Sequence, residues 1–183
     1  YDIQQVPNLK VLGRTVADAS PLPRFWTHSG IEENCTGTEL WIELECDYDI
    51  YEIWVASEVN RALMARQMIY PGKNSICLYR GMAAGTVKNV RFYRELQAMN
   101  PSPNMHMVIT GVRTDGEFLP VKDAALKLEF IGDSITSGEG AYGNPKETEW
   151  LSMFMCSTRD YTNLLERMID CECRVLSAQV KLE

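Results

Sequence analysis

The stretch from Leu126 to Gly143, LKLEFIGDSITSGEGAYG, decides how the fold of this chain is interpreted. A run rich in Leu, Phe and Ile, from Leu126 to Ile131, ends at Gly132, and Asp133 and Ser134 follow at once. Such a run is typical of a buried strand in a parallel sheet, and glycine allows a sharp turn after it. Ligands of open α/β sheets bind beyond the carboxyl ends of the strands. Ser134 is therefore a candidate nucleophile, with neighbouring backbone N–H groups available to an oxyanion.

The same polar residues also have a structural interpretation. Asp133, Ser134 and Thr136 are residue types that form turns and cap helices, because their side-chain oxygens accept hydrogen bonds from free backbone N–H groups. The spacing alone does not separate a nucleophile from a cap.

Length and composition indicate a globular protein of one domain or two small ones. The chain has 183 residues, of which 45% are hydrophobic and 23% are charged. A net charge of −7 without a Lys/Arg cluster argues against a nucleic-acid partner. No apolar run has the length of a membrane span, so we expect no membrane partner. The N-terminus, Tyr1-Asp2-Ile3-Gln4, does not have the form of a signal peptide, although one could have been removed.

The cysteine pattern favours free thiols. The chain has an even number of cysteines at irregular spacing, Cys35, Cys46, Cys77, Cys156, Cys171 and Cys173. Cys46 and Cys77 fall in expected strands, where a free cysteine is usually a small buried apolar residue. Cys171 and Cys173 lack the second pair that a zinc site needs. We expect no metal and no cofactor, and a cytoplasmic location is favoured slightly over secretion, which stays open.

The first 124 residues have the pattern of a β-sandwich. The segment from Leu40 to Cys46 alternates strictly between apolar and other residues, which is typical of a half-buried strand. Further runs are rich in β-branched and aromatic residues, and turn signals separate them at short intervals. These expected strands are Tyr51 to Ser57, Ser75 to Arg80, Val87 to Tyr93 and Met105 to Val112.

One further segment of this part is ambiguous. The residues from Arg61 to Tyr70 fit a helix face or a strand, and the following Pro71-Gly72 favours the strand. The alternation also predicts the core of the sandwich. Its members are Leu40, Ile42, Leu44, Ile53 and Val55.

Beyond Ala124 the pattern changes to strand, helix and strand. The helix is expected to begin after Asp160 and to carry an apolar stripe of Tyr161, Leu164, Leu165, Met168 and Ile169. A second short strand follows from Arg174 to Ser177, and together these elements make a right-handed βαβ unit. We therefore expect a mainly β chain with a sandwich at 1–124 and an α/β part at 125–183.

Several motifs resemble a known group of enzymes. The string from Phe130 to Thr136 resembles the first signature block of the SGNH (GDSL-type) hydrolases, serine esterases and acylhydrolases on a flavodoxin-like sheet. Gly138-Glu139-Gly140, the string from Phe25 to Ile31, and Thr114-Asp115-Gly116 are similar to carbohydrate esterase family 2. Members of that family remove acetyl groups from plant polysaccharides, and a jelly-roll domain precedes their catalytic domain.

The resemblance implies roles for three residues. Ser134 would be the nucleophile, and its own backbone N–H would contribute to the oxyanion hole. Gly132 and Asp133 transfer with it as flanking members of the block. The implied substrate is an acetylated carbohydrate of the xylan or mannan type.

Other parts of the family pattern have no match in this chain. The family's base histidine comes late in its catalytic domain, whereas the only histidines here, His28 and His106, lie in the expected sandwich. The residues from Ala178 to Glu183 depart from the second block where its glycine should appear. We therefore expect an incomplete catalytic domain that is inactive alone and is completed by a separate chain, by a second copy or by packing on the sandwich, with partial disorder as the alternative. The terminal Lys181-Leu182-Glu183 fits either a natural or an engineered end.

A second function class remains open, in which the sandwich is a non-catalytic carbohydrate-binding module. Sugar sites use exposed aromatic faces, and the tryptophans are Trp26, Trp41, Trp54 and Trp150. Trp41 and Trp54 fall within expected strands, where packing is the commoner role. Trp150 follows the serine loop and is the best placed for sugar contact.

Overall fold

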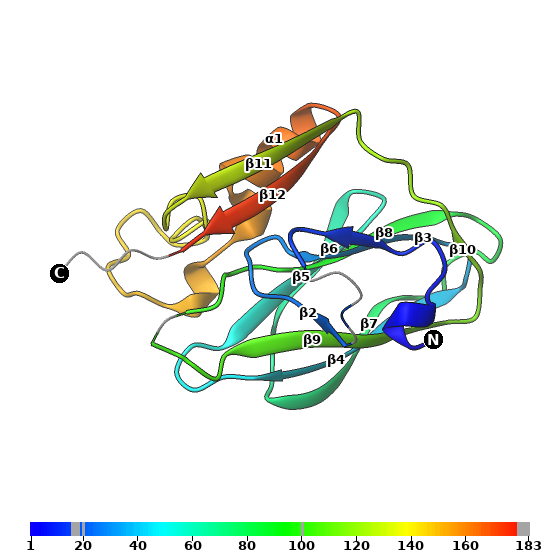
Figure 1. Cartoon of the computed structure of the whole chain (residues 1–183), viewed down its shortest axis with the longest axis horizontal. Coiled ribbons are helices and arrows are strands. Elements are labelled where there is room, and N and C mark those ends of the chain that lie inside the picture. Colours follow the sequence, from blue (N-terminus) through cyan, green and yellow to red (C-terminus); the bar gives the residue numbers. More distant parts are fainter. Residues whose placement is uncertain (16–18, 20, 100, 179–183) are drawn as a thin grey trace.

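The computed structural model describes residues 1–15, 19, 21–99 and 101–178. Two sheets form a sandwich, and a separate two-stranded sheet with its helix lies beside it (Figure 1). This is the mainly β fold class that the sequence predicts. Residues 179–183, which include Lys181-Leu182-Glu183, lie outside the described residues.

The sandwich consists of a six-stranded and a four-stranded sheet. The first has the order β1 (Lys10–Leu12), β3 (Gly30–Cys35), β8 (Lys88–Arg94), β5 (Ile53–Val59) and β6 (Ala62–Ile69), with β10 (Phe118–Leu119) paired to β3. The second has the order β2 (Leu22–Pro23), β9 (His106–Thr114), β4 (Glu39–Asp47) and β7 (Gly72–Arg80). All pairings in both sheets are antiparallel, and a short 3-10 helix, η1 (Ile3–Gln5), precedes them.

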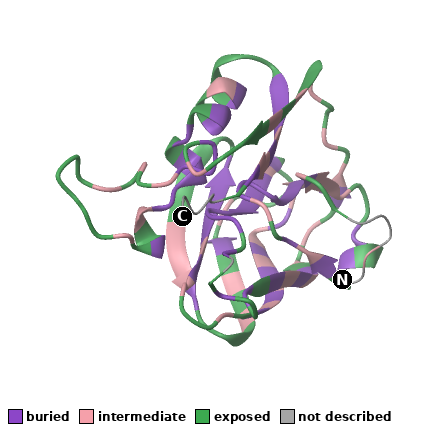
Figure 2. Cartoon of the chain, turned by 60° about the vertical axis from the view of Figure 1, so that its left-hand side comes forward, coloured by how far each residue is buried: buried purple, intermediate pink, exposed green. Residues whose placement is uncertain are grey.

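The core of the sandwich confirms the alternation in the sequence. The predicted residues Leu40, Ile42, Leu44, Ile53 and Val55 are all buried between the two sheets. The ambiguous segment is strand β6, as the following Pro-Gly turn indicated. Figure 2 shows this buried interior beneath a more exposed shell.

The α/β part confirms the βαβ unit. It contains β11 (Leu126–Gly132), the 3-10 helices η2 (Ser152–Phe154) and η3 (Ser157–Arg159), helix α1 (Tyr161–Met168) and β12 (Cys171–Ser177). β11 and β12 are parallel over their whole length. Asp160 caps α1, accepting a hydrogen bond from the backbone N–H of Tyr161 at 2.8 Å.

Helix α1 turns its polar side to the protein. Thr162, Asn163 and Glu166 are buried, whereas most of the predicted apolar stripe is exposed. Met168 is 80% exposed and Leu164 is 46% exposed. Glu166 and Asn163 are buried against Arg91 and His28 of the sandwich, as described below. The stripe thus predicts the helix correctly but not the face that this chain buries.

The prediction that the strand before Gly132 is buried is wrong for this chain. β12 is mostly buried, but β11 has exposed or half-buried residues throughout, and Ile131 is 81% exposed. β11 pairs only with β12, so its other edge has no partner among the described strands. A parallel strand normally has both faces covered. The exposed apolar residues of β11 and α1 therefore form an uncovered apolar surface.

Candidate functional site

Ser134 lies just beyond the carboxyl end of β11, in a compact turn. We call residues 133–143 the serine loop. The carbonyl oxygen of Ser134 accepts hydrogen bonds from the N–H groups of Ser137 at 3.2 Å and Glu139 at 3.0 Å. The N–H of Gly138 donates to the Ile135 carbonyl oxygen at 3.0 Å. These bonds fix the backbone on which the half-buried Ser134 side chain stands.

The side chains of Asp133 and Ser134 differ in their contacts. Asp133 Oδ1 accepts a hydrogen bond from the Ile135 N–H at 3.0 Å, which is the turn-forming role considered for it above. Across residues 1–15, 19, 21–99 and 101–178, no hydrogen bond engages Ser134 Oγ or the Ser134 N–H. Asp133 therefore shapes the turn, whereas the Ser134 hydroxyl makes no such structural contact with the described residues.

Gly132 is required by a close approach. A Cβ at this position would lie 2.1 Å from Thr136 Oγ1 and 2.7 Å from Thr136 Cβ. Thr136 is held there by a 3.0 Å hydrogen bond between its hydroxyl and that of Tyr161 on α1. The glycine thus lets the serine loop fold back onto the end of its own strand.

The serine loop is attached to the segment that precedes α1. The N–H of Cys156 donates to the Gly138 carbonyl oxygen at 3.0 Å, and the N–H of Tyr142 donates to the Phe154 carbonyl oxygen at 3.2 Å. Gly138 has φ +76°, and a Cβ there would lie 2.4 Å from the Cys156 carbonyl oxygen. Only glycine fits this conformation and this approach.

His28 is part of a buried polar network between the sandwich and α1. Its Nε2 lies 3.2 Å from Glu166 Oε2, and its Nδ1 lies 3.1 Å from Asn163 Nδ2. Arg91 Nη2 lies 3.1 Å from the same Nε2, so both ring nitrogens have polar partners. Arg91 Nη2 forms a 2.6 Å ion pair with the same Glu166 oxygen. With both ring nitrogens engaged and its side chain buried, His28 is not available as a base for Ser134.

The carboxyl group of Glu166 is strongly biased toward its charged form. Burial alone would raise its pKa, but the hydrogen bond and electrostatic interaction with His28 and the charge of Arg91 outweigh burial. The pKa of Glu166 is therefore held well below its usual range. The Cys173 N–H donates to its second oxygen at 3.0 Å, so the carboxylate ties α1, β8 and β12 together.

His106 is remote from the serine loop. It is exposed at the start of β9, in the four-stranded sheet on the far side of the sandwich from β11 and β12 (Figure 1). Its Nδ1 lies 2.8 Å from the Asn104 carbonyl oxygen. Both histidines are described by the structure, and neither is brought to Ser134.

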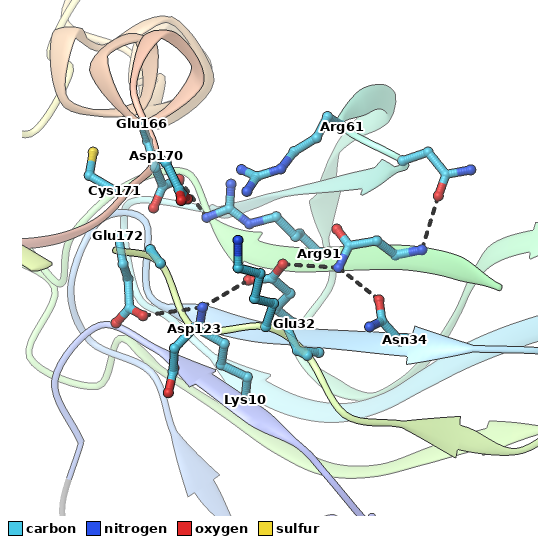
Figure 3. Close-up of a pocket in the computed structure, with 15 residues that line it drawn as sticks. Lys10, Glu32, Asn34, Arg61, Arg91, Asp123, Glu166, Asp170, Cys171 and Glu172 are labelled. Atoms are coloured by element: carbon cyan, nitrogen blue, oxygen red, sulfur yellow. Dashed lines mark hydrogen bonds and ion pairs between the residues drawn. The ribbon is translucent and has the colours of Figure 1, made fainter. Parts of the chain in front are cut away.

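A polar cavity of about 360 Å³ lies at the opposite end of the two-stranded sheet (Figure 3). Ala124 and Cys171, which line it, lie at the amino ends of β11 and β12. Lys10 Nζ lies 3.6 Å from Glu32 and 3.2 Å from Glu172, so it links the sandwich to β12 there. A seven-residue strand is roughly 20 Å long, so this cavity is separate from Ser134.

A smaller cavity of about 280 Å³ borders the serine loop. Its lining includes Glu139, Gly143, Trp150 and Phe154. Trp150 Nε1 donates to Glu139 Oε1 at 2.7 Å, and its ring packs edge-on against Tyr51 with centroids 4.5 Å apart. Trp150 is therefore both a packing residue and a wall of this cavity.

All six cysteines are free, as expected, but their burial differs from the expectation at one position. Cys77 is exposed, because it lies on the outer side of β7. The Sγ atoms of Cys171 and Cys173 are 3.7 Å apart. Over the described ranges, no group of three His, Cys, Asp or Glu side chains is arranged to hold a metal ion. No helix in the part of the chain that the structure describes is long and apolar enough to span a membrane.

Comparison with known proteins places these features in context. No protein-family model matches the chain, and no curated protein matches it significantly. An acetyl xylan esterase from the rumen bacterium Butyrivibrio proteoclasticus is 44% identical, with a TM-score of 0.94, over 98% of this chain and 48% of that chain. The chain thus spans about half the length of this protein.

Two further solved structures share the fold. A family two carbohydrate esterase from Clostridium thermocellum, solved in complex with cellohexaose, is 21% identical with a TM-score of 0.82, over 93% of this chain and 51% of that one. The salicylyl-acyltransferase SsfX3 of a tetracycline biosynthetic pathway is 14% identical with a TM-score of 0.65, over 94% and 53%. The matches confirm the resemblance that the sequence motifs indicated.

Proposed function

Because this chain resembles carbohydrate esterase family 2 enzymes in sequence and fold, we propose that it carries the nucleophile of a serine esterase that deacetylates carbohydrates. The observation that carries this proposal is the position of Ser134. It stands beyond the carboxyl end of a parallel strand, where α/β sheets bind ligands, on a turn fixed by backbone hydrogen bonds. Its hydroxyl has no hydrogen bond to any described residue.

The reaction is an acyl transfer in two steps. Ser134 Oγ attacks the acetyl carbonyl carbon while a histidine base takes the hydroxyl proton, and the Ser134 N–H donates to the oxyanion. The sugar oxygen leaves with that proton, and water then hydrolyses the acetyl-serine. His28 and His106 do not serve as this base, so it comes from polypeptide beyond the described residues.

The substrate that we propose is an acetylated plant polysaccharide of the xylan or mannan type. Support comes from the 44% identity to a protein described as an acetyl xylan esterase. The cavity beside the serine loop is lined by Trp150 and by carboxylates such as Glu139 and Glu147, residue types that suit the apolar faces and hydroxyl groups of a sugar.

We further propose that additional polypeptide covers β11 and α1 in the active protein. Ile131, Ile135 and Met168 are all more than two-thirds exposed, at 81%, 72% and 80%. The strands of a parallel sheet normally have both faces covered by further layers. The solved relatives are about twice as long as the part that this chain matches, which supports the same conclusion.

The experiment is ester hydrolysis by the complete protein and by its Ser134→Ala variant. We expect Ser134→Ala to lower kcat for a small acetyl ester by several orders of magnitude, since the nucleophile acts as a unit with its base. Ser75→Ala is a matched control, because Ser75 is exposed on β7 and its hydroxyl donates a hydrogen bond to Glu43. Near-normal turnover by Ser134→Ala would contradict the assignment. Polysaccharide binding without any hydrolysis would favour the alternative of a carbohydrate-binding module.

A further inference from the structure

We propose that Arg66, on sandwich strand β6, is a positioning residue that holds the serine loop in its catalytic shape; this rests on the proposed function of Ser134. The guanidinium group of Arg66 lies over two aromatic rings. Its Cζ lies 4.6 Å from the centroid of Trp54 on β5 and 4.6 Å from that of Tyr142 in the serine loop. A guanidinium above an aromatic face is attracted by the ring's charge distribution, and more strongly when shielded from water.

A second arginine, Arg159, also lies over the ring of Tyr142. The Cζ of Arg159, at the end of η3, lies 4.2 Å from the Tyr142 centroid. The serine loop is thus bound through one aromatic ring to the sandwich and to the segment before α1. Tyr142 is 41% exposed, so it depends on these contacts rather than on a core.

Arg66 also contacts the segment of η2 and η3, which is hydrogen-bonded to the serine loop. Its Nη2 donates to the Met155 carbonyl oxygen at 2.5 Å, and its Nε lies 3.8 Å from Glu95 Oε1. Glu95 is completely buried and accepts a hydrogen bond from the Thr158 N–H at 3.2 Å and another from the Thr158 hydroxyl. The Ser157 N–H donates to the Glu95 carbonyl oxygen at 3.2 Å. Arg66 and Glu95 therefore place η2 and η3 on the sandwich.

This anchored segment makes both attachments to the serine loop described above. Cys156 bonds Gly138, and Phe154 bonds Tyr142. The loop in turn fixes the nucleophile, because the Glu139 N–H donates to the Ser134 carbonyl oxygen. A continuous series of contacts thus runs from Arg66 through Met155 and Cys156 to the backbone of Ser134.

An arginine is needed at this position for geometric reasons. A planar guanidinium can stack between two rings while it donates at its edge, whereas a lysine ammonium is a compact point charge. Arg66→Lys should keep the ion pair with Glu95 but lose the stacking on Trp54 and Tyr142. It is therefore a graded test of the positioning role.

The experiment measures kcat and KM of the complete protein on a small acetyl ester. We expect Arg66→Ala to lower kcat by roughly 10- to 10²-fold with KM nearly unchanged, because small displacements of a nucleophile cost rate more than binding. Arg66→Lys should restore part of kcat. Arg113→Ala is the matched control, since Arg113 also stacks on a tryptophan, Trp41, at 4.6 Å, but in the four-stranded sheet. It should retain full activity.

Amide hydrogen exchange on the 183-residue chain gives a second readout that needs no activity. Arg66→Ala should accelerate exchange at Tyr142 and Cys156 about tenfold or more, whereas Arg113→Ala should not. The proposal is overturned if Arg66→Ala keeps normal kcat while Ser134→Ala is inactive, or if its serine loop exchanges as slowly as in the parent chain. If Ser134→Ala stays active, the proposed function fails instead, and the exchange data still test the role of Arg66.

Discussion

Substitution of Glu166 by alanine tests whether the buried polar face of α1 holds the α/β part on the sandwich. The carboxylate accepts from Arg91 at 2.6 Å, His28 at 3.2 Å and the Cys173 N–H at 3.0 Å, and its side chain is 2% exposed. Removing it leaves the guanidinium of Arg91, itself 1% exposed, without its closest anion. Another carboxylate near Arg91, that of Glu58, is 3.9 Å away.

The expected loss follows from this geometry. Breaking a buried ion pair by removing one partner costs about 3–5 kcal/mol, and the remaining Glu58 places the value at about 3 kcal/mol. The double variant Arg91→Met/Glu166→Leu should lose less than the sum of the single losses, because neither charge is then left unpaired. Glu43→Ala is the control, since its pair with Arg113 is exposed and should be worth less than about 1 kcal/mol.

The assay is urea unfolding of the 183-residue chain, followed by tryptophan fluorescence and circular dichroism. The pH dependence gives a second observable. Because the folded pKa of Glu166 lies below its ordinary value of 4.5, its stabilisation is fully present above that pH and is lost as the pH falls below it. Glu166→Ala should therefore flatten the loss of stability below about pH 4.5. A loss of stability as small as that of Glu43→Ala would refute the reasoning. An unchanged pH dependence of stability at acid pH in Glu166→Ala would refute it too.

Three other experiments have defined outcomes. Ile131→Lys should change the stability of the 183-residue chain by less than about 0.5 kcal/mol, since the side chain is exposed, but should destabilise the complete protein strongly; equal effects in both would count against a covered β11. Gly132→Ala should lower kcat, because its Cβ meets Thr136, and Gly132→Ala/Thr136→Gly should recover part of it; no loss in the single variant would disprove the close approach. Thiol titration of the native chain should find one fast thiol, Cys77, and slow reaction of the five buried cysteines; rapid reaction of several would contradict their burial.

The sequence predicts the sandwich well because the alternation of residues along each strand indicates which side chains are buried. The alternation from Leu40 to Cys46 is enough to define β4, which extends by only one residue at each end, and the side of the strand that faces the core. The Ser134 turn is likewise visible, because a glycine and polar residues follow an apolar run. These features depend on neighbours in the chain.

The buried network was not predictable in the same way. His28 and Glu166 are 138 residues apart, and charged residues are normally assigned to the surface. The apolar stripe of α1 predicted the helix but not which of its faces is buried. Arg91 and Glu58 of the sandwich form ion pairs with Glu166 and Arg167 on the polar face of the helix. The role of Arg66 also depends on long-range contacts, and nothing in the sequence around it indicates its contact with Tyr142. The division of the chain near residue 124 stays a prediction.

The central claim is that Ser134 is the nucleophile of an esterase site that further polypeptide completes. Labelling with a fluorophosphonate, followed by mass spectrometry of the modified peptide, tests both halves, because such a reagent reacts with a serine only where a base activates it. The account predicts that Ser134 is labelled in the complete protein and is not labelled in the 183-residue chain alone. Labelling of a different serine in the complete protein, or equal labelling of Ser134 in the chain alone, would contradict it.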